Sequence, residues 1–512
     1  MSPNPLAPTL SPKGRGSPRA TPLRQAAALS IVIGIMLAMF LSALEQTIVA
    51  PALPTIGRAF ANVEDLSWVV TAYLLSATAA TPLFGKLSDI YGRRVMMMIS
   101  IGIFVAGSIA CALAPSLSAL ILARALQGFG GGGILPLSQT VIADLLSPRE
   151  RPLAQAYTSV MFLVACILGP VLGGILTDRL HWSLIFWINV PLGAAALIMT
   201  DRALRRLPRN DRPHRLDFIG AALMVGAAVA LLLALNWGGT RYAWTSPQLL
   251  ALIGGSFALW IAFALRLLRA PEPFIPLAMI KQPVVFGIVV AGFFSIGTII
   301  GLSIFVPLHI QLVLGYSASA AGLALIAFMS GASLGSMTAG RLMVRIDRYK
   351  RVPIVAIPIA VAGLLTLAAF PAGLSLWEVA GLLVLVGAGI GPMYPTTTVI
   401  IQNAVLPHQL GIATGSLNFF RTLGGAIIVA VFAAIVLGGF DNPGGGLTLD
   451  KLVHSASSGA AFAGAFRFVF IAAAIFLLAA MVAVAAIEER PLRGPATTSP
   501  RLRGEVAAEG GG

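Results

Sequence analysis

Charged residues are scarce in this chain: Asp, Glu, Lys and Arg together make up 10% of its 512 residues. A soluble protein typically carries charge on about a quarter of its residues, so this scarcity excludes an ordinary soluble domain. Cysteine is also scarce, with 2 residues, Cys111 and Cys166. Both fall in apolar segments, where we expect free thiols packed as small apolar groups.

Patterns that indicate an enzyme or an ATP-driven pump are absent from the sequence. The 5 histidines are scattered, without a metal-ligand spacing such as H-x-x-x-H. There is no loop of the form G-x-x-x-x-G-K-[ST] for nucleotide phosphates, and no second carboxylate near Glu45 that could form an acid–base pair. We therefore predict no enzymatic activity, no metal and no cofactor. Any energy that the protein needs for its activity is then expected to come from a gradient.

Long apolar runs dominate what is present, since hydrophobic residues make up 57% of the chain. Each membrane crossing needs roughly 20 mostly apolar residues. The pattern predicts an all-α integral membrane protein with about fourteen transmembrane helices. The runs that begin near Leu153 and Leu184 are the weakest, because Gly, Pro and Trp interrupt them. The expected spans are 28–49, 67–84, 95–114, 118–143, 153–176, 184–200, 216–236, 247–265, 284–306, 320–340, 352–370, 376–398, 412–438 and 461–487.

Lysine and arginine outnumber aspartate and glutamate by 34 to 19, which gives a net charge of +15. With the N-terminus in the cytoplasm, about 27 of the basic residues fall on the cytoplasmic side, as the positive-inside rule requires. Both termini are then cytoplasmic. Nucleic-acid binding is the competing explanation, but the basic residues recur in short loops between spans, such as Arg202 to Arg215. We therefore predict no nucleic-acid partner.

Both ends of the chain are predicted to be disordered. Residues 1–25 are rich in Pro, Ser and Arg, and residues 488–512 in Pro, Arg, Gly and Thr. The first apolar run is too long for the core of a signal peptide and contains Glu45. We therefore expect it to be a retained helix.

Similar segments recur at an offset of 255 residues, which indicates an internal repeat. Gly85-Lys86-Leu87 ends the second span and Gly340-Arg341-Leu342 ends the tenth, while Gly169 and Gly424 repeat the same offset. We predict two related six-helix bundles, 26–203 and 284–487, with a basic loop and two inserted helices in the segment 204–283. Such repeats build a site at the bilayer midplane that opens to either side.

Four segments resemble signatures of the major facilitator superfamily. GKLSDIYGRR, residues Gly85 to Arg94, is similar to the pattern G-x-L-[AS]-D-x-x-G-R-[RK], and LARALQGFGGG from Leu122 is similar to L-x-x-R-x-x-Q-G-x-G. GPVLGG from Gly169 resembles the antiporter signature G-P-x-x-G-G. ALEQTIVAPALP from Ala43 resembles the first-span signature of the 14-helix drug:proton antiporters. The resemblance implies a multidrug antiporter driven by a proton gradient.

The resemblance also implies that the segment Gly85 to Arg94, called here the gate loop, closes the cytoplasmic side in the outward-open state. We expect Gly85 and Gly92 to permit tight chain reversal, and Asp89 to cap a helix or pair with an arginine. A merely solvated, basic loop is the alternative. The implied gate residues are Gly85, Lys86, Asp89, Gly92, Arg93 and Arg94.

The antiporter motif consists of Gly169, Pro170, Gly173 and Gly174. Small residues at positions i and i+4 let another helix approach closely, and the proline distorts the helix and removes one backbone hydrogen bond. Generic helix packing is the alternative explanation. The resemblance implies export rather than import.

Glu45 in the first span and Arg124 in the fourth lie at similar depths in the outer half of the membrane. An ionisable group there is costly and indicates function, and a partner of opposite charge reduces the cost. We predict that the two residues pair and that the pair loosens when Glu45 takes a proton. A permanently locked structural pair is the alternative. The family's usual residue at the position of Glu45 is Asp.

Four further polar residues within apolar spans are candidates for a central substrate cavity. They are Gln46, Gln127, Asn418 and Arg421. Arg421 has no identifiable acidic partner at its depth, which leaves carbonyls, water or an anionic group of the substrate.

The sequence thus predicts a proton-coupled exporter of small lipophilic compounds, neutral or singly positive, with dications handled poorly. We expect a monomer in the cytoplasmic membrane of a bacterium, with its substrate, protons and the lipid bilayer as partners. A dedicated exporter of one metabolite, siderophore or antibiotic is the main alternative. A membrane-embedded enzyme or channel is a weaker one.

Overall fold

A computed structural model describes residues 22–60, 65–205, 216–238, 241–346, 348–438 and 459–489. Within these ranges every regular element is a helix. Fourteen helical segments there are long and apolar enough to cross a membrane. The predicted all-α fold with fourteen spans is therefore confirmed. Residues 1–21, 206–215 and 490–512, which include most of both predicted tails and of the basic loop, lie outside the described ranges.

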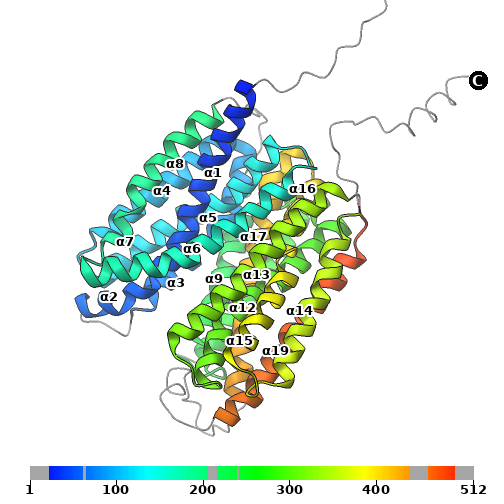
Figure 1. Cartoon of the computed structure of the whole chain (residues 1–512). Helices are drawn as coiled ribbons and strands as arrows, with labels where there is room; N and C mark the ends of the chain where they lie inside the picture. The colour runs from blue at the N-terminus through cyan, green and yellow to red at the C-terminus, as the bar shows by residue number, and fades with distance from the viewer. Residues whose placement is uncertain are drawn as a thin grey trace, which may run out of the picture.

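The helices form two groups of six spans that lie side by side (Figure 1). The first group comprises α1 (Pro22–Ile48) with η1 (Ala50–Ala52) and α2 (Leu53–Phe60), α3 (Trp68–Tyr91), α4 (Arg93–Ala112), α5 (Leu117–Leu145), α6 (Arg151–Arg179), and α7 (Leu184–Trp187) with α8 (Asn189–Leu204). The second comprises α12 (Pro283–Leu312), α13 (Ala318–Arg345), α14 (Arg351–Ala369), α15 (Leu376–Ile390) with α16 (Met393–Ala404), η2 (Pro407–Gln409) with α17 (Leu410–Gly438), and α19 (Gly459–Ala486).

The inserted pair consists of α9 (Phe218–Trp237) and α10 (Pro247–Arg269), followed by the short helix α11 (Leu277–Ile280). The two long helices pack on each other, and α9 also contacts α3 of the first group and α17 of the second. The pair is therefore placed beside the seam between the two groups. Asp217 begins α9 by accepting a hydrogen bond from the backbone N–H of Gly220, and it forms an ion pair with Arg266 of α10.

Contacts between the two groups repeat at the offset found in the sequence. A Cβ atom added to Gly85 of α3 would collide with the carbonyl of Gly411 in α17. At the related positions 255 residues apart, Gly340 of α13 lies as closely against Ala156 of α6. Residues without bulky side chains thus let two pairs of helices approach closely across the seam, α3 with α17 and α6 with α13. The equivalence agrees with a two-fold relation between the halves.

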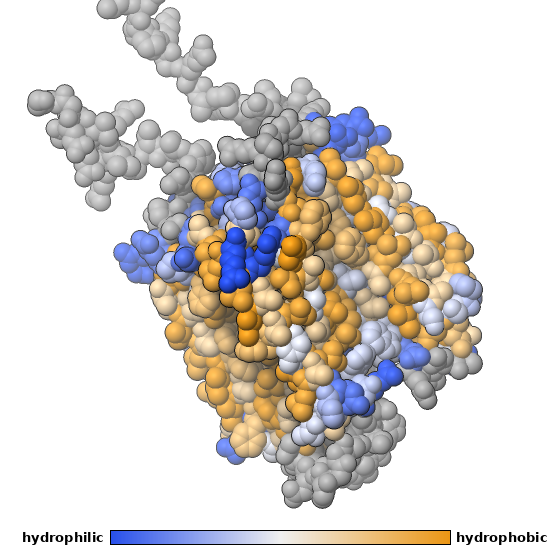
Figure 2. All heavy atoms as spheres, turned by 180° about the vertical axis from the view of Figure 1, so that it is seen from behind, coloured by the Kyte–Doolittle hydropathy of each residue, from blue (hydrophilic) through white to orange (hydrophobic). Residues whose placement is uncertain are grey.

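Hydrophobic side chains cover most of the outer face between the two ends of the molecule, and hydrophilic ones gather toward the ends (Figure 2). Large apolar residues such as Phe218, Phe257, Phe286 and Leu334 are more than half exposed. A surface of this kind suits lipid rather than water. The chain is accordingly a multi-pass membrane protein.

Two expected boundaries are wrong. Helix α1 begins at Pro22, so residues 22–25 belong to a helix and not to the N-terminal tail. At the other end, the side chain of Glu489 accepts a hydrogen bond from the backbone N–H of Lys350, so the first residues of the predicted C-terminal tail pack beside α14. In both cases the structured part extends further than apolarity alone indicates.

Candidate functional site

A cavity of about 330 Å³ lies between the two groups of helices, with walls from α1, α3, α5 and α6 on one side and α12, α13, α16 and α17 on the other. Most of its surface is apolar, and it has the size expected of a site for a small molecule. Of the described residues that line it, none is a carboxylate. Its polar lining is Ser42, Gln46, Tyr73, Thr78, Thr81, Ser159, Ser303, Ser333, Tyr394, Asn418, Arg421 and Thr422.

Glu45 and Arg124 form the predicted ion pair. Both are buried, with 0% and 1% of their surface exposed. Arg124 also donates to the side-chain oxygen of Gln127 at 2.6 Å and to the carbonyl of Val69 at 2.9 Å, while Asn189 donates to the second oxygen of Glu45. A buried pair is stable only with such further hydrogen bonds, so the site is built to hold both charges.

The cavity does not reach this ion pair. Glu45, Arg124 and Gln127 are absent from its lining, whereas Tyr73 belongs to it. The guanidinium carbon of Arg124 lies 4.4 Å from the centroid of the Tyr73 ring. The prediction that Gln127 lines the cavity is therefore wrong, because its amide turns to Arg124 and to the hydroxyl of Ser108. Glu45 is likewise not the cavity carboxylate that the expected preference for cations requires.

Gln46, Asn418 and Arg421 do line the cavity, as predicted. Arg421 takes a carbonyl as one partner, that of Tyr394 at 3.1 Å. Asn418 donates to the side-chain oxygen of Gln139 in α5 at 2.7 Å, which links the two groups of helices behind the cavity wall.

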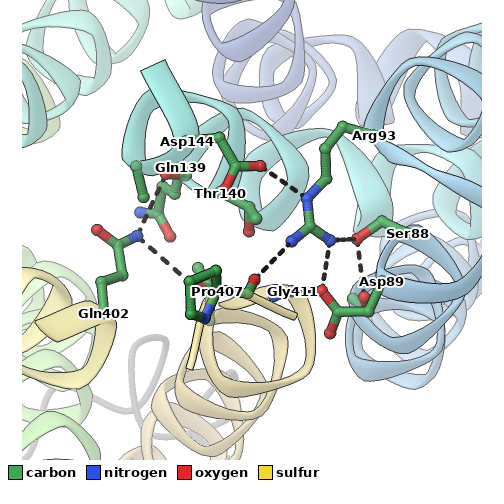
Figure 3. Close-up of polar contacts among 12 residues, drawn as sticks. Ser88, Asp89, Arg93, Gln139, Thr140, Asp144, Gln402, Pro407 and Gly411 are labelled. Atoms are coloured by element: carbon green, nitrogen blue, oxygen red, sulfur yellow. Dashed lines mark hydrogen bonds and ion pairs between the residues drawn. The ribbon is translucent and has the colours of Figure 1, made fainter. Parts of the chain in front are cut away.

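The gate loop joins the two halves through Asp89 (Figure 3). This carboxylate accepts hydrogen bonds from the backbone N–H groups of Gly411 and Ile412, at 2.9 and 2.8 Å, and forms an ion pair with Arg93. Those N–H groups belong to the first turn of α17, where a negative charge is favourable. The prediction that Asp89 caps a helix and pairs with an arginine is confirmed.

Arg93 extends the same cluster, called here the gate cluster. Its guanidinium contacts Asp144 of α5 at 2.9 Å and the hydroxyl of Ser88 at 2.8 Å, and it reaches the carbonyl of Pro407 in the second half at 3.4 Å. The dashed lines in Figure 3 trace these contacts. Close by, Gln402 of α16 donates to the backbone carbonyl of Gln139 at 3.2 Å. The halves are thus hydrogen-bonded together at this end, called here the gate end.

Two expectations about the gate loop change, those for Gly85 and Arg94. Gly85 lies within α3 and serves close packing against Gly411, so only Gly92, with φ of 91°, makes the chain reversal. Arg94 does not join the halves; it forms an ion pair with Asp201 of α8 inside the first half. Lys86 is half-buried on α3, one turn before Asp89.

The antiporter motif packs on the first span. A Cβ atom on Gly169 would collide with the side chain of Thr47, and one on Gly173 with the carbonyl of Ile48. Thr47 in turn donates to the carbonyl of Ala165 at 2.9 Å. A Cβ atom on Gly174, by contrast, would have no atom of another element within 4 Å, and Pro170 is exposed. The motif therefore fixes α6 against the helix that carries Glu45, and only two of its glycines make the contact.

Several polar residues of these sites were missed in the sequence. Asn189 is the first residue of α8, just after the break at Ile188 in the sixth span, and Gln139 lies in the apolar part of α5. Tyr394, Thr397 and Thr398 stand at the start of α16, just after the break at Gly391 and Pro392. A hydroxyl-rich run after a helix break inside a membrane span is the signal that could have found them.

Comparison with known proteins gives consistent results. A family model described as Major Facilitator Superfamily matches residues 35–429. The multidrug transporter protein MdtP of Bacillus subtilis (strain 168) is 32% identical over 430 residues, covering 84% of this chain and 78% of that protein. Multidrug resistance protein 3 of the same organism is 31% identical over 422 residues, 82% of each chain. A solved bacterial homologue of the iron transporter ferroportin in an outward-facing state aligns over 90% of this chain and 98% of its own, with TM-score 0.63 and 12% identity.

Proposed function

The chain belongs to the Major Facilitator Superfamily, and from this membership we propose that it exports small, largely apolar compounds in exchange for protons by alternating access. It is a membrane transporter and not an enzyme. Relatives at 31–32% identity bear the names of multidrug transporters, which supports a substrate range wider than one compound. Export of one metabolite, siderophore or antibiotic is the second candidate.

The buried pair of Glu45 and Arg124 carries the proposal of proton coupling. Glu45 is fully buried, and the partners that hold it are one arginine and one amide. A proton on Glu45 removes the charge that Arg124 faces, and Arg124 keeps Gln127, Val69 and the ring of Tyr73 as neutral partners. Because Tyr73 also lines the cavity, a shift of Arg124 changes the wall that a substrate touches.

The gate cluster supports alternating access. The halves are hydrogen-bonded at the gate end by Asp89, Arg93 and Gln402, and the cavity lies between the same halves. Release of these contacts would let the halves separate there, as rocking of two repeats around a fixed site requires. We place the gate end in the cytoplasm of a bacterial cell, and the protein, as a monomer, in its cytoplasmic membrane.

The cavity supports only part of the expectation that neutral and singly positive compounds are transported and dications are handled poorly. Dications remain poor candidates, because the described lining of the cavity has no carboxylate and carries Arg421. A single positive charge loses its expected partner as well, since Glu45 is held outside the cavity wall. Of the neutral and cationic compounds expected from the sequence, the neutral ones therefore fit this cavity better.

Flux measurements in everted membrane vesicles test the proposal. Accumulation of a lipophilic probe inside the vesicles should require an inside-acid pH gradient, and a protonophore should abolish it. The Glu45→Gln protein is the matched control and should show no such accumulation. Probe uptake of equal size with and without the pH gradient, or equal uptake by the Glu45→Gln protein, would reject proton coupling.

A further inference from the structure

Among the described residues that line the cavity, Arg421 is the charged one, and the hydrogen-bond partners it has there are all neutral. It is 2% exposed. One guanidinium nitrogen, Nη2, donates to the carbonyl of Tyr394 at 3.1 Å and to the hydroxyls of Thr397 and Thr398 at 2.5 and 2.9 Å. Nη1 has a longer contact to Asn418 at 3.3 Å, and Nε, which is buried, has no hydrogen-bond partner in the described part of the chain.

This arrangement leaves a positive charge incompletely compensated in a membrane-embedded site. Burying a charge is costly unless an opposite charge and hydrogen bonds offset the loss of water. At Arg124 the chain supplies a carboxylate for that purpose, namely Glu45. At Arg421 the described part of the chain supplies only dipoles and the face of the Tyr394 ring, whose centroid lies 4.7 Å from the guanidinium carbon. An anion is thus the partner that the site lacks.

A second donor lies next to Arg421. The hydroxyl of Tyr394 accepts a hydrogen bond from Gln139 at 2.8 Å, which leaves its own hydrogen available to donate. Tyr394 and Arg421 both line the cavity. Two donors, one of them charged, suit the oxygens of a carboxylate better than those of a neutral amide.

The rest of the cavity accommodates an apolar body. Its lining also includes aliphatic and aromatic side chains from both halves, among them Leu74, Phe162, Ile299 and Met329. The volume of about 330 Å³ exceeds that of an isolated anion and suits a small ring system. The cavity therefore combines an anion-binding end with apolar walls.

We propose that the compounds bound in this cavity are lipophilic organic monoanions, with the anionic group on Arg421 and Tyr394 and the apolar part between the two halves. The inference rests on the proposed function, because it takes the cavity to be the transport site. The proposed binding mode also connects the cavity to the gate end, because Gln139 of the first half is hydrogen-bonded to both Tyr394 and Asn418 of the second. An anion that draws Tyr394 and Arg421 toward itself competes with these inter-half hydrogen bonds.

Equilibrium binding to the purified full-length protein in lipid nanodiscs tests the inference without any transport step. The probes are 2-naphthoate and 2-naphthamide, which share an apolar body and differ in charge. Wild-type protein should bind the carboxylate about tenfold more tightly than the amide, equivalent to about 1.4 kcal/mol. Arg421→Gln should abolish this preference, and Arg421→Lys should retain part of it.

Arg467→Gln is the matched control, because Arg467 is an exposed residue of α19 in the same half and its loss changes the net charge equally. Its preference should equal that of the wild type. If Arg421→Gln does not fold, Tyr394→Phe replaces it and should reduce the preference about threefold. Equal affinity for the two probes, or no binding of naphthoate, would overturn the inference. A preserved preference together with gradient-independent flux would instead reject the proposed function alone.

Discussion

The side-chain amide of Gln139 donates a 2.8 Å hydrogen bond to the hydroxyl of Tyr394, a residue 255 positions later in the chain. This separation equals the offset of the internal repeat, so the two residues occupy equivalent positions in the two halves. Equivalent positions can touch only near the axis that relates the halves. Gln139 also accepts from Asn418 and, through its carbonyl, from Gln402. One residue of the first half thus holds three residues of the second, next to the cavity.

Replacing Gln139 with Leu should make the gate end open more readily. The substitution removes side-chain hydrogen bonds to Tyr394 and Asn418, each worth about 1 kcal/mol and more when a buried partner is left unpaired. Spin-label distances between the halves at the gate end should shift toward longer values. Gln311→Leu, at an exposed position of α12, serves as the control and should leave the distances unchanged. An unaltered distribution in Gln139→Leu would contradict the role of Gln139 as an inter-half link.

Glu45→Gln should abolish uphill export, while Glu45→Asp should retain a measurable part. The amide keeps the shape of the side chain but cannot exchange a proton, whereas aspartate keeps the carboxyl group on a shorter arm. The shorter arm reaches Arg124 and Asn189 less well, so a reduced rate is expected. Substrate accumulation in vesicles with an imposed pH gradient measures the effect. Normal pumping by the Gln protein would mean that Glu45 is not the coupling group.

Arg124→Ala should reduce both transport and folding yield more than Arg124→Lys. Removal of one partner leaves a buried charge unpaired, at a cost of about 3–5 kcal/mol. The double variant Glu45→Gln with Arg124→Gln should therefore yield more folded protein than Arg124→Ala alone, because no charge remains. Size-exclusion profiles of the solubilised proteins report the yield. Independent, additive effects of the two sites would argue against an energetic coupling between them.

Asp89→Asn should lower the transport rate with little loss of protein from the membrane. An amide retains one acceptor oxygen, but it loses the ion pair with Arg93 and the charge-assisted hydrogen bonds from Gly411 and Ile412. Such bonds are worth about 1.5–3 kcal/mol, and they hold the closed gate rather than a helix core. Asp178→Asn, on the exposed end of α6, is the control. Full activity of the Asp89→Asn protein would reject the gating role.

Alanine substitutions should show which glycines of the antiporter motif pack against α1. Gly169→Ala and Gly173→Ala should each destabilise the contact between α6 and α1, by about 1–3 kcal/mol, because the added methyl group meets Thr47 or Ile48. Gly174→Ala should not destabilise the protein, since nothing lies within 4 Å of the new atom and alanine favours a helix. Thermal unfolding of the purified variants measures the difference. Equal destabilisation at all three positions would contradict a packing contact confined to Gly169 and Gly173, because helix propensity alone favours alanine over glycine.

Much of the fold could be predicted from the sequence, because lipid offers few alternatives. An apolar run of about 20 residues must satisfy its backbone hydrogen bonds internally, and a helix is the form that does so. The pairing of Glu45 with Arg124 could be predicted for a similar reason: two opposite charges at one depth are costly apart. The helix cap formed by Asp89 could also be predicted, because this residue lies in a recognised motif. The helix that it caps, α17, could not be predicted.

The direction in which each polar residue faces was decided by the tertiary structure alone. Glu45 and Arg421 both lie in long apolar spans, yet the first is buried against Arg124 outside the cavity lining and the second lines the cavity. In a water-soluble helix, a polar stripe and an apolar stripe reveal which side is buried. A membrane helix is apolar on nearly every side, so its sequence fixes the depth of a residue but not the rotation of the helix. That rotation is set by close contacts between helices far apart in the chain, such as Gly85 on Gly411 and Gly169 on Thr47.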